Sequence, residues 1–444
     1  MAGKKERAMP DATFPVPPAL LEKDMDVAVI GSGMAGLAAS VFAVNRGLAA
    51  ARLGSTGDIA YTTGYLDLLG IPVGGCDPAA DPRDGLAALL AGNPDHPYGK
   101  VAWESVEAAM AEFTAFLGEA GLPYVSRGRN MTAFSPMGTA KTTYAVPATM
   151  LAGVDALAKR SSCLLVDFTG LKAFSAKGIA AALREVWPAI TPVTLPFPDQ
   201  WFGELYPEAM ARALEVPSIR VALADLIRPH LGAASCVGLP AILGITGSAL
   251  VQEHLASLLG VPVFEIPTLP PGVPGIRLRE NLDDVLRAKG VNLFSQRYAY
   301  RVYTEDGLFC IEAGESAPEF TVRAKALILA TGRFLSGGLV ADRVEGIREP
   351  LLHLPVEAPA NRDDWHREDF FDPAGHPVNR AGVQVNTDFR PLGPGGAIVD
   401  PNLYAIGSVL AGQDWVREKS GAGIALASAY TAVAAIARAA KEAV

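Results

Sequence analysis

Residues 26–47 show the pattern of apolar and polar positions around which the rest of the chain is interpreted. Residues 27–30 are a short apolar run, V-A-V-I, and glycines follow it at once. Such a β-branched run before glycines is typical of a buried strand that enters a sharp turn. An uncharged, alanine-rich stretch follows from about residue 35 and predicts a helix. The stretch therefore predicts a strand–turn–helix unit.

The turn has the spacing of a dinucleotide-binding loop. Gly31, Ser32, Gly33 and Gly36 stand in the sequence G-S-G-M-A-G. In this spacing the first glycine permits the tight turn, the second lets the backbone approach a pyrophosphate, and the third lets helix and strand pack closely. Phosphates would bind free amides at the positive end of the helix. We interpret the loop as a dinucleotide or flavin site, with a structural glycine turn as the alternative.

One expected part of this site is missing. A carboxylate that binds the adenosine ribose normally ends the second strand, about 20 residues after the first glycine. Here the predicted second strand, residues 48–53, ends in Arg52 and Leu53, and no acid appears before Asp58. The sequence thus supports the pyrophosphate half of the site and not the adenosine half.

Two later stretches also place glycines directly after a predicted strand. Residues 320–330 run into Thr331 and Gly332, and residues 400–408 end in Gly407 and Ser408. A long alanine-rich helix is predicted from about residue 423, and two glycines mark its start: Gly421 and Gly423. The positive end of that helix would stabilise negative charge on a reduced flavin.

The loop that follows the second strand, residues 55–69, holds small hydroxyl residues and a glycine. Thr62, Thr63 and Gly64 would let backbone amides approach a planar ring closely. An ordinary polar loop is the alternative interpretation.

Together these stretches predict an α/β fold with a split Rossmann-like flavin-binding domain. We assign residues 24–85 and 276–444 to this domain, residues 86–275 to an inserted α+β substrate or cap domain, and residues 1–23 to a flexible tail. Helices are expected at residues 101–118, 178–189 and 279–289, short strands within 121–147, and a hairpin of residues 298–304 and 308–312. The proline-dense residues 261–278 suit a crossing between domains.

Net charge and cysteine content exclude some classes of protein. The net charge of -9 argues against a nucleic-acid binder, which needs clustered Lys and Arg. The four cysteines lie far apart in the sequence: Cys76, Cys163, Cys236 and Cys310. This spacing predicts no cysteine metal site. It favours buried free thiols in a protein of the reducing cytoplasm. No signal peptide or transmembrane segment is predicted.

Several longer motifs resemble a known family. They are Y-T-T-G-Y-L-D-L-L, T-L-P-P-G-V-P-G-I-R-L, T-G-R-F-L-S-G-G-L-V-A, G-I-R-E-P and N-L-Y-A-I-G-S-V-L. With the first glycine loop, they are similar to the B subunit of anaerobic glycerol-3-phosphate dehydrogenase from about residue 24 to the end. One departure is that Ser408 follows Gly407 where the wider flavin family has an aspartate.

The resemblance implies a cytoplasmic flavoprotein, peripheral to the inner membrane through its partners. These are a second flavin subunit and a membrane-associated iron–sulfur subunit. The implied reaction oxidises sn-glycerol 3-phosphate to dihydroxyacetone phosphate and passes electrons to quinone. The implied cofactor is FMN, and FAD is not excluded.

Three residues are candidates for catalysis. Alcohol oxidation needs a base, and His353, just after G-I-R-E-P, is the histidine chosen for this role. Arg277 and Arg348 lie in family-matching motifs and have a guanidinium that suits a phosphate. A packed histidine and internal ion pairs are the alternatives. Two other functions stay open: a self-sufficient flavin dehydrogenase or reductase of another small anion, and a non-catalytic adaptor subunit.

Overall fold

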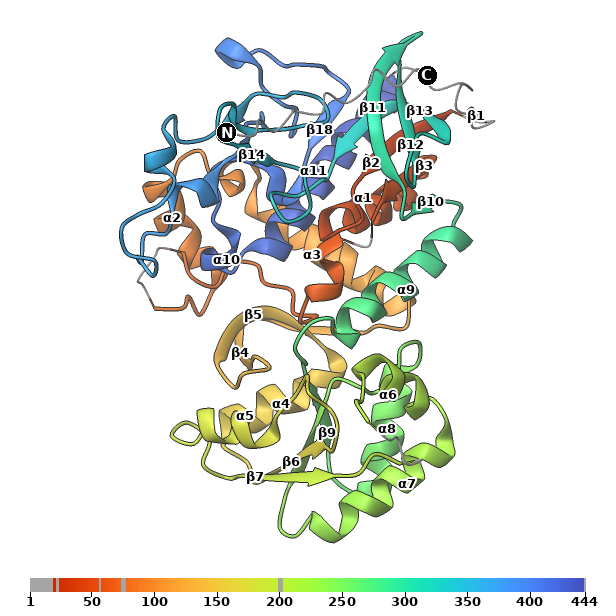
Figure 1. Cartoon of the computed structure of the whole chain (residues 1–444), viewed down its shortest axis with the longest axis vertical. Coiled ribbons are helices and arrows are strands. Elements are labelled where there is room, and N and C mark those ends of the chain that lie inside the picture. The colour runs from red at the N-terminus through yellow and green to blue at the C-terminus, as the bar shows by residue number, and fades with distance from the viewer. Residues whose placement is uncertain (1–18, 21–23, 56, 73–76, 199–202, 443–444) are drawn as a thin grey trace, which may run out of the picture.

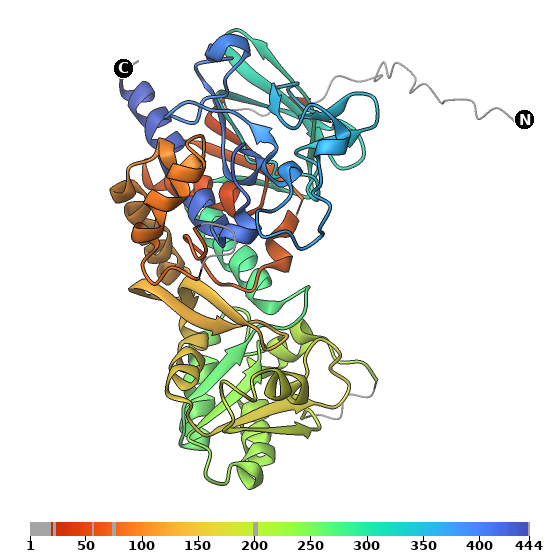
Figure 2. The same ribbon diagram turned by 90° about the vertical axis from the view of Figure 1, so that its left-hand side faces the viewer.

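The computed structural model describes residues 19–20, 24–55, 57–72, 77–198 and 203–442. The described parts of the chain form two bodies stacked along the long axis, and the first and last described elements, β1 (Ala19–Leu20) and α11 (Gly421–Glu442), both belong to the upper one (Figures 1 and 2). We call the upper one the flavin body and the lower one the insert. Most of the predicted tail lies outside the described residues, but residues 19 and 20 form strand β1 (Ala19–Leu20).

The flavin body is built on a mixed sheet whose strands run in the order β10-β3-β2-β13-β12-β11. The first four pair in parallel, β13 to β11 pair antiparallel, and β1 and β18 flank β13 in parallel. The bounds are β2 (Met25–Ile30), β3 (Ala50–Gly54), β10 (Asn292–Ser295), β11 (Tyr298–Glu305), β12 (Leu308–Gly314), β13 (Phe320–Leu329) and β18 (Leu403–Ala405). The predicted hairpin about residue 306 and the parallel strand–turn–helix unit are both confirmed.

Helix α1 (Met34–Asn45) packs on strands β2 and β3 of this sheet, and the amphipathic α3 (Trp103–Glu119) and the apolar α11 (Gly421–Glu442) pack against α1 and against each other. They share one hydrophobic core, in which the ring of Phe42 meets Phe113 at 6.5 Å and Tyr430 at 5.3 Å between centroids. α11 is long and apolar enough to cross a membrane, yet most of its apolar stretch is buried against α1 and α3. It serves as a core helix of the flavin body.

The insert has a hydrophobic core of its own around a four-stranded parallel sheet. An antiparallel hairpin joins this sheet to the flavin body (Figure 1). The strands are β4 (Tyr124–Phe134) and β5 (Ala140–Pro147) in the hairpin, then β6 (Cys163–Phe168), β7 (Ile190–Leu195), β8 (Cys236–Pro240) and β9 (Val263–Ile266) in the order β7-β6-β8-β9. The helices are α4 (Ala148–Lys159), α5 (Ala176–Ala182), α6 (Pro207–Leu214), α7 (Pro217–Ile227) and α8 (Ser248–Leu259).

Shorter elements complete the chain. They are α2 (Pro82–Gly92), α10 (Trp415–Glu418), β14 (Val340–Asp342), β15 (Gly346–Arg348), β16 (Val356–Glu357), β17 (Gly382–Val383), and the 3-10 turns η1 (Gly57–Tyr61), η2 (Pro97–Lys100), η3 (Arg228–His230), η4 (Arg362–Asp364), η5 (Pro377–Arg380), η6 (Pro394–Gly396) and η7 (Gly407–Val409). Cys163, Cys236 and Cys310 are buried free thiols, whereas Cys76 lies outside the described residues.

The sequence placed the start of the insert at residue 86, which is too early. α3 buries Trp103, Phe113 and Phe116 in the core of the flavin body, and the insert begins with β4. Apolar spacing along α3 identified the helix but not the core that it joins. Helix α9 (Val273–Ala288) also begins six residues before its predicted start at residue 279. Proline in the first turn of a helix removes no helical hydrogen bond, so Pro274 lies within this first turn instead of preceding the helix.

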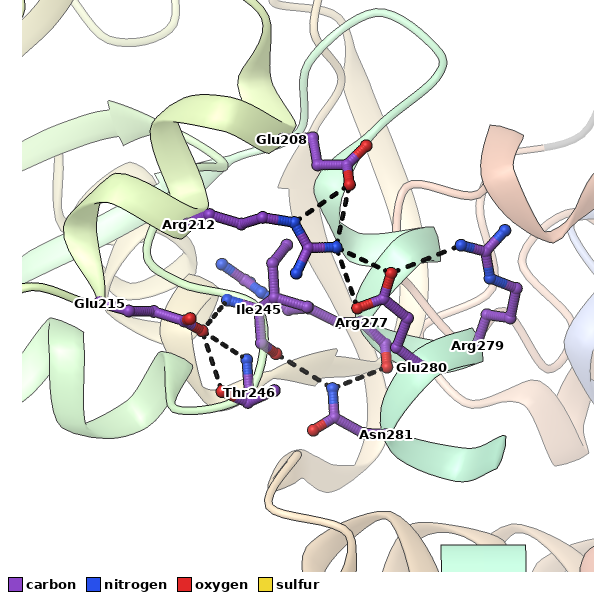
Figure 3. A network of polar contacts seen from close by, with 9 residues as sticks. All are labelled: Glu208, Arg212, Glu215, Ile245, Thr246, Arg277, Arg279, Glu280 and Asn281. Atoms are coloured by element: carbon purple, nitrogen blue, oxygen red, sulfur yellow. Dashed lines mark hydrogen bonds and ion pairs between the residues drawn. The ribbon is translucent and has the colours of Figure 1, made fainter. Parts of the chain in front are cut away.

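Helix α9 lies between the two bodies (Figure 1), and two buried ion pairs hold it there. Figure 3 shows further polar contacts of this helix with the insert, Glu280 with Arg212 and Asn281 with Ile245. Toward the insert, Arg277 donates to both carboxylate oxygens of Glu265 at 2.6 and 2.7 Å and to the carbonyl of Gly244 at 2.7 Å. Toward the flavin body, Asp283 pairs with Arg52 of β3, and both side chains are buried. Asn281 adds a bond to the carbonyl of Ile245 at 3.0 Å. One rigid helix therefore fixes how the two bodies meet.

The buried pair of Arg277 and Glu265 is expected to contribute more to the stability of the protein than an exposed pair on the same helix. Glu265→Gln leaves the Arg277 charge buried without its carboxylate, which lowers the free energy of unfolding by about 3–5 kcal/mol. The matched control is Glu280→Gln on the same helix, because Glu280 pairs at 2.9 Å with an exposed Arg212. That change is expected to cost less than about 1 kcal/mol. Urea denaturation followed by circular dichroism compares the two variants, and equal losses would contradict the role given to α9.

Candidate functional site

Three glycine turns lie in contact at the carboxyl ends of β2, β13 and β18. Gly31 has a φ of 129°, and a Cβ on it would lie 2.1 Å from the carbonyl oxygen of Ala330. A Cβ on Gly332 would lie 3.6 Å from Oγ of Ser408, and one on Gly407 would lie 2.6 Å from a Cβ in the first turn of α1. The three turns, which come from distant parts of the sequence, therefore lie next to one another at one edge of the sheet.

Gly33 and Gly36 have different environments although they belong to one motif. A Cβ on Gly36 would lie 1.9 Å from the carbonyl oxygen of Gly31, so this position is closed by packing. Gly33 has an ordinary φ of -76°, and a Cβ there would meet nothing within 4 Å. Gly33 is also the N-cap of α1, and no side chain caps that helix. The first amides of α1 and the space beside Gly33 thus form a cradle that suits an anionic group.

The end of β3, where a ribose-binding carboxylate is normally found, is occupied by other contacts. Gly54 has a φ of 152°, and a Cβ on it would lie 3.0 Å from both N and Oγ of Ser32. Arg52, two residues earlier, turns away from this edge and is buried in its pair with Asp283. Arg52 of this strand therefore contacts helix α9. The end of the strand, at Gly54, contributes only backbone atoms to the glycine turns.

Arg333 holds two of the three turns together, and the sequence interpretation missed it. Its guanidinium donates to the carbonyl of Ser408 at 2.6 Å, to those of Leu410 and Gln413 at 2.9 Å each, and to that of Asn379. Burial lowers the pKa of Arg333 to about 10. Its place directly after T-G was the available signal, since a charged residue at the end of a buried strand needs partners.

The loop predicted to approach a planar ring lies at the junction with the insert. A Cβ on Gly64, which has a φ of 84°, would lie 2.8 Å from Pro274, and the Gly64 carbonyl accepts a hydrogen bond of 2.7 Å from Tyr124. Thr62 accepts a bond of 3.2 Å from the Gly64 amide, and Thr63 accepts one of 3.5 Å from Lys141 of β5. The loop therefore connects the flavin body to the hairpin of the insert.

The two glycines at the start of α11 are used in packing. A Cβ on Gly421 would lie 2.9 Å from the ring of Trp415, and one on Gly423 would lie 2.0 Å from the hydroxyl oxygen of Tyr98. The Gly423 amide donates to the carbonyl of Asp67 at 2.8 Å, so it is not free to bind a flavin. The packing of both glycines was not expected from the sequence, because the partners lie far away in the chain.

None of the three candidate catalytic residues makes a described hydrogen bond or ion pair with the glycine turns. Arg277 is wrong as a phosphate ligand, because it is 3% exposed and its donors bind Glu265 and Gly244. Arg348 lies on the small hairpin of β14 and β15 and pairs with Glu345 at 3.0 Å. His353 is exposed and adopts a left-handed φ of 54°. No described hydrogen bond or ion pair of Arg348 or His353 reaches a glycine turn, and their roles stay predictions.

Comparison with known proteins identifies the family. A family model described as an FAD binding domain matches residues 26–424. A probable B subunit of anaerobic glycerol-3-phosphate dehydrogenase from Halobacterium salinarum is 32% identical over 94% of this chain and 98% of its own length. The chain belongs to the family of anaerobic glycerol-3-phosphate dehydrogenase B subunits. Other B subunits of this family, from Yersinia pestis and Aliivibrio fischeri, are 30% and 28% identical and cover 91% and 93% of the chain and 96% and 95% of their own lengths.

Among solved structures, a 3-ketosteroid delta1-dehydrogenase from Sterolibacterium denitrificans is 12% identical with a TM-score of 0.43, covering 94% of this chain and all of its own. A glycine oxidase from Bacillus cereus is 12% identical with a TM-score of 0.33, covering 94% and 96%.

Membership in this family makes the chain a flavin-dependent oxidoreductase subunit. The matched model is one for FAD, so the flavin predicted from the glycine loop is confirmed, whereas the sequence resemblance implied FMN. The structure fits such a group at the open cradle beside Gly33, where an uncapped helix and free space meet. The described residues hold no cluster of three or more His, Cys, Asp or Glu side chains suited to a metal ion.

The cradle makes a direct prediction about two glycines of one motif. Gly33→Val keeps the fold, because its backbone is ordinary and its Cβ enters open space, but the side chain fills the position of the phosphate. Flavin released by denaturation is expected to fall to a small fraction of the wild-type amount, while the melting temperature matches that of wild type freed of its flavin. Gly36→Val instead overlaps the Gly31 carbonyl and is expected to destabilise the whole flavin body. Full flavin content in the Gly33 variant would reject the cradle.

Proposed function

We propose that this chain is a flavin subunit of a complex that oxidises sn-glycerol 3-phosphate to dihydroxyacetone phosphate and passes the electrons to quinone. The observation that supports this most is the match to B-subunit relatives over nearly the full length of both chains, together with the open cradle beside Gly33. In the proposed complex the partners are a second flavin subunit and a membrane-associated iron–sulfur subunit. They hold this chain at the cytoplasmic side of the inner membrane.

The residues around the three glycine turns would hold the flavin. The first amides of α1, with Ser32 and Gly33, bind the phosphates, and Arg333 keeps the loops after β13 and β18 in place. The flavin supplies the hydride acceptor that alcohol oxidation requires. The protein binds and orients the substrate and accepts its hydroxyl proton. His353 stays the residue to test as that base, by comparing the pH dependence of kcat in His353→Gln and wild type.

The proposal predicts that activity depends on partner subunits. The isolated chain is expected to retain flavin but to show little reduction of quinone with glycerol 3-phosphate, because the electrons have no path onward. Adding the purified partner subunits is expected to raise the rate of quinone reduction by at least an order of magnitude. A tenfold change in rate corresponds to about 1.4 kcal/mol in the activation free energy. Quinone reduction followed by absorbance measures both states.

Each other outcome selects a different function. Full quinone reductase activity from the single chain would favour the self-sufficient dehydrogenase. Activity of the isolated chain with a soluble dye and a different small anion would do the same. A purified chain that holds no flavin, in a complex that is nevertheless active, would favour the non-catalytic adaptor.

A further inference from the structure

Three charged side chains from distant parts of the sequence meet where the insert joins the flavin body. They are Lys141 of strand β5, Asp67 of the loop after η1, and Lys419, which precedes α11. Lys141 pairs with Asp67 at 3.0 Å. Backbone bonds fix the arrangement, because Leu66 bridges to Ala145 of β5 and the amide of residue 70 donates to the carbonyl of Lys419 at 3.1 Å.

This cluster carries more positive than negative charge. Asp67 pairs with Lys141, although burial raises the pKa of its carboxyl group. Asp414 also acts on Lys419, but it pairs with Arg417 at 3.5 Å. The ammonium group of Lys419 forms no hydrogen bond or ion pair with any residue that the structure describes. Burial and the nearby Lys141 lower the pKa of Lys419. The side chains of Lys141 and Asp67 are only 22% and 15% exposed, so water screens the surplus charge incompletely. An anion bound here would relieve that repulsion.

The Lys141 ammonium has further contacts that hold it in place. It lies 3.5 Å from Oγ1 of Thr63 and 5.3 Å from the centroid of the Tyr65 ring. One oxygen of Asp67, Oδ1, is buried and has no hydrogen-bond partner among the described residues. That oxygen is an acceptor and cannot bind an anion, so an anion here would bind through the two ammonium groups, of which Lys141 is held in a fixed position.

Helix α11 connects this cluster directly to the glycine turns. The Gly423 amide binds the carbonyl of Asp67, and Oγ of Ser428 accepts a hydrogen bond of 3.0 Å from the amide of Gly407. These two positions are five residues apart, which is roughly 7–8 Å along a helix at 1.5 Å per residue. The cluster also lies beside the positive end of this 22-residue helix. Junctions between domains are common places for ligand sites.

We propose that Lys141 and Lys419 form the binding site for the phosphate group of a small phosphorylated polyol. The inference rests on the proposed function, because it places that substrate beside the flavin cradle. Asp67 is a positioning residue that orients Lys141 and, as a carboxylate, keeps the empty site from carrying two unopposed charges. A purely structural junction would need one lysine for one carboxylate, and here a second lysine is held without a partner among the described residues.

The test measures binding of inorganic phosphate, glycerol 3-phosphate and uncharged glycerol to the flavin-loaded full chain by calorimetry. Lys141→Met and Lys419→Met are each expected to weaken phosphate and glycerol 3-phosphate binding by about tenfold or more, the usual effect of losing one charged hydrogen bond. Lys141→Arg keeps the charge and is expected to retain most of the affinity. Glycerol is expected to bind none of these forms measurably.

The matched control is Lys289→Met. Lys289 also pairs with a carboxylate, Glu119 at 3.3 Å, and also lies over a ring, 5.4 Å from the centroid of Phe116, but it belongs to the end of α9. This variant is expected to bind phosphate like wild type. Flavin content and melting temperature without phosphate show whether each variant is folded, and Asp67→Asn, which removes only the negative charge, is expected to bind phosphate at least as tightly as wild type.

The outcomes separate this inference from the proposed function. Unchanged phosphate affinity in both lysine-to-methionine variants, no binding by wild type, or an equal loss in the Lys289 control would overturn the site. A reconstituted complex that oxidises glycerol 3-phosphate with the same KM in wild type and in both variants would also overturn it, while leaving the proposed function in place. Wild-type binding that both variants lose, with no oxidation by the complex, would instead reject the proposed function and keep the anion site.

Discussion

The two buried ion pairs of α9 determine how the rest of the molecule is assembled. Arg277 and Asp283 are six residues apart, about 9 Å along the helix, and they bind charges on opposite bodies. Removing charged groups from water costs several kcal/mol each, so each pair is favourable only when its partner is held in place. The insert therefore has one well-defined position, and the hairpin that carries Lys141 is brought against the loop of Asp67.

A second constraint is the close approach of backbone atoms at the glycine turns. β2 and β13 are almost 300 residues apart, yet they pair in parallel as the central strands of the sheet. The absence of a side chain at Gly31 lets the two strand ends touch, and its absence at Gly36 lets α1 pack on the same turn. Arg333 then binds carbonyls from the loop after β18, which brings the third turn to the first two. The flavin cradle is thus a product of packing as much as of the motif.

Features that depend on neighbouring residues were predictable from the sequence, and features that depend on distant partners were not. The strand at residues 27–30, the hairpin about residue 306 and the split of the domain follow from local apolar patterns and turn residues. The assignment of α3 to the flavin body depends on which core its apolar face meets, and periodicity does not contain that information. For the same reason the packing of Gly421 and Gly423 was not predictable, because it depends on Trp415 and Tyr98, whereas the predicted role of this helix end toward the flavin stays a prediction.

The basic residues show most clearly why residue type alone does not identify a ligand site. Arg277 has the guanidinium that suits a phosphate, but Glu265 occupies both of its terminal nitrogens. Arg127 likewise pairs with Asp155, and Arg348 with Glu345. A cation that is already paired has little to gain from an external anion, because binding would first break the internal pair. What distinguishes Lys141 and Lys419 is the balance of charge around them, since only Lys141 has a carboxylate of its own, Asp67, and the other carboxylate that acts on Lys419, Asp414, pairs with Arg417. An anion-binding residue of this chain is therefore identified by whether its positive charge already has a negatively charged partner, and not by its residue type alone.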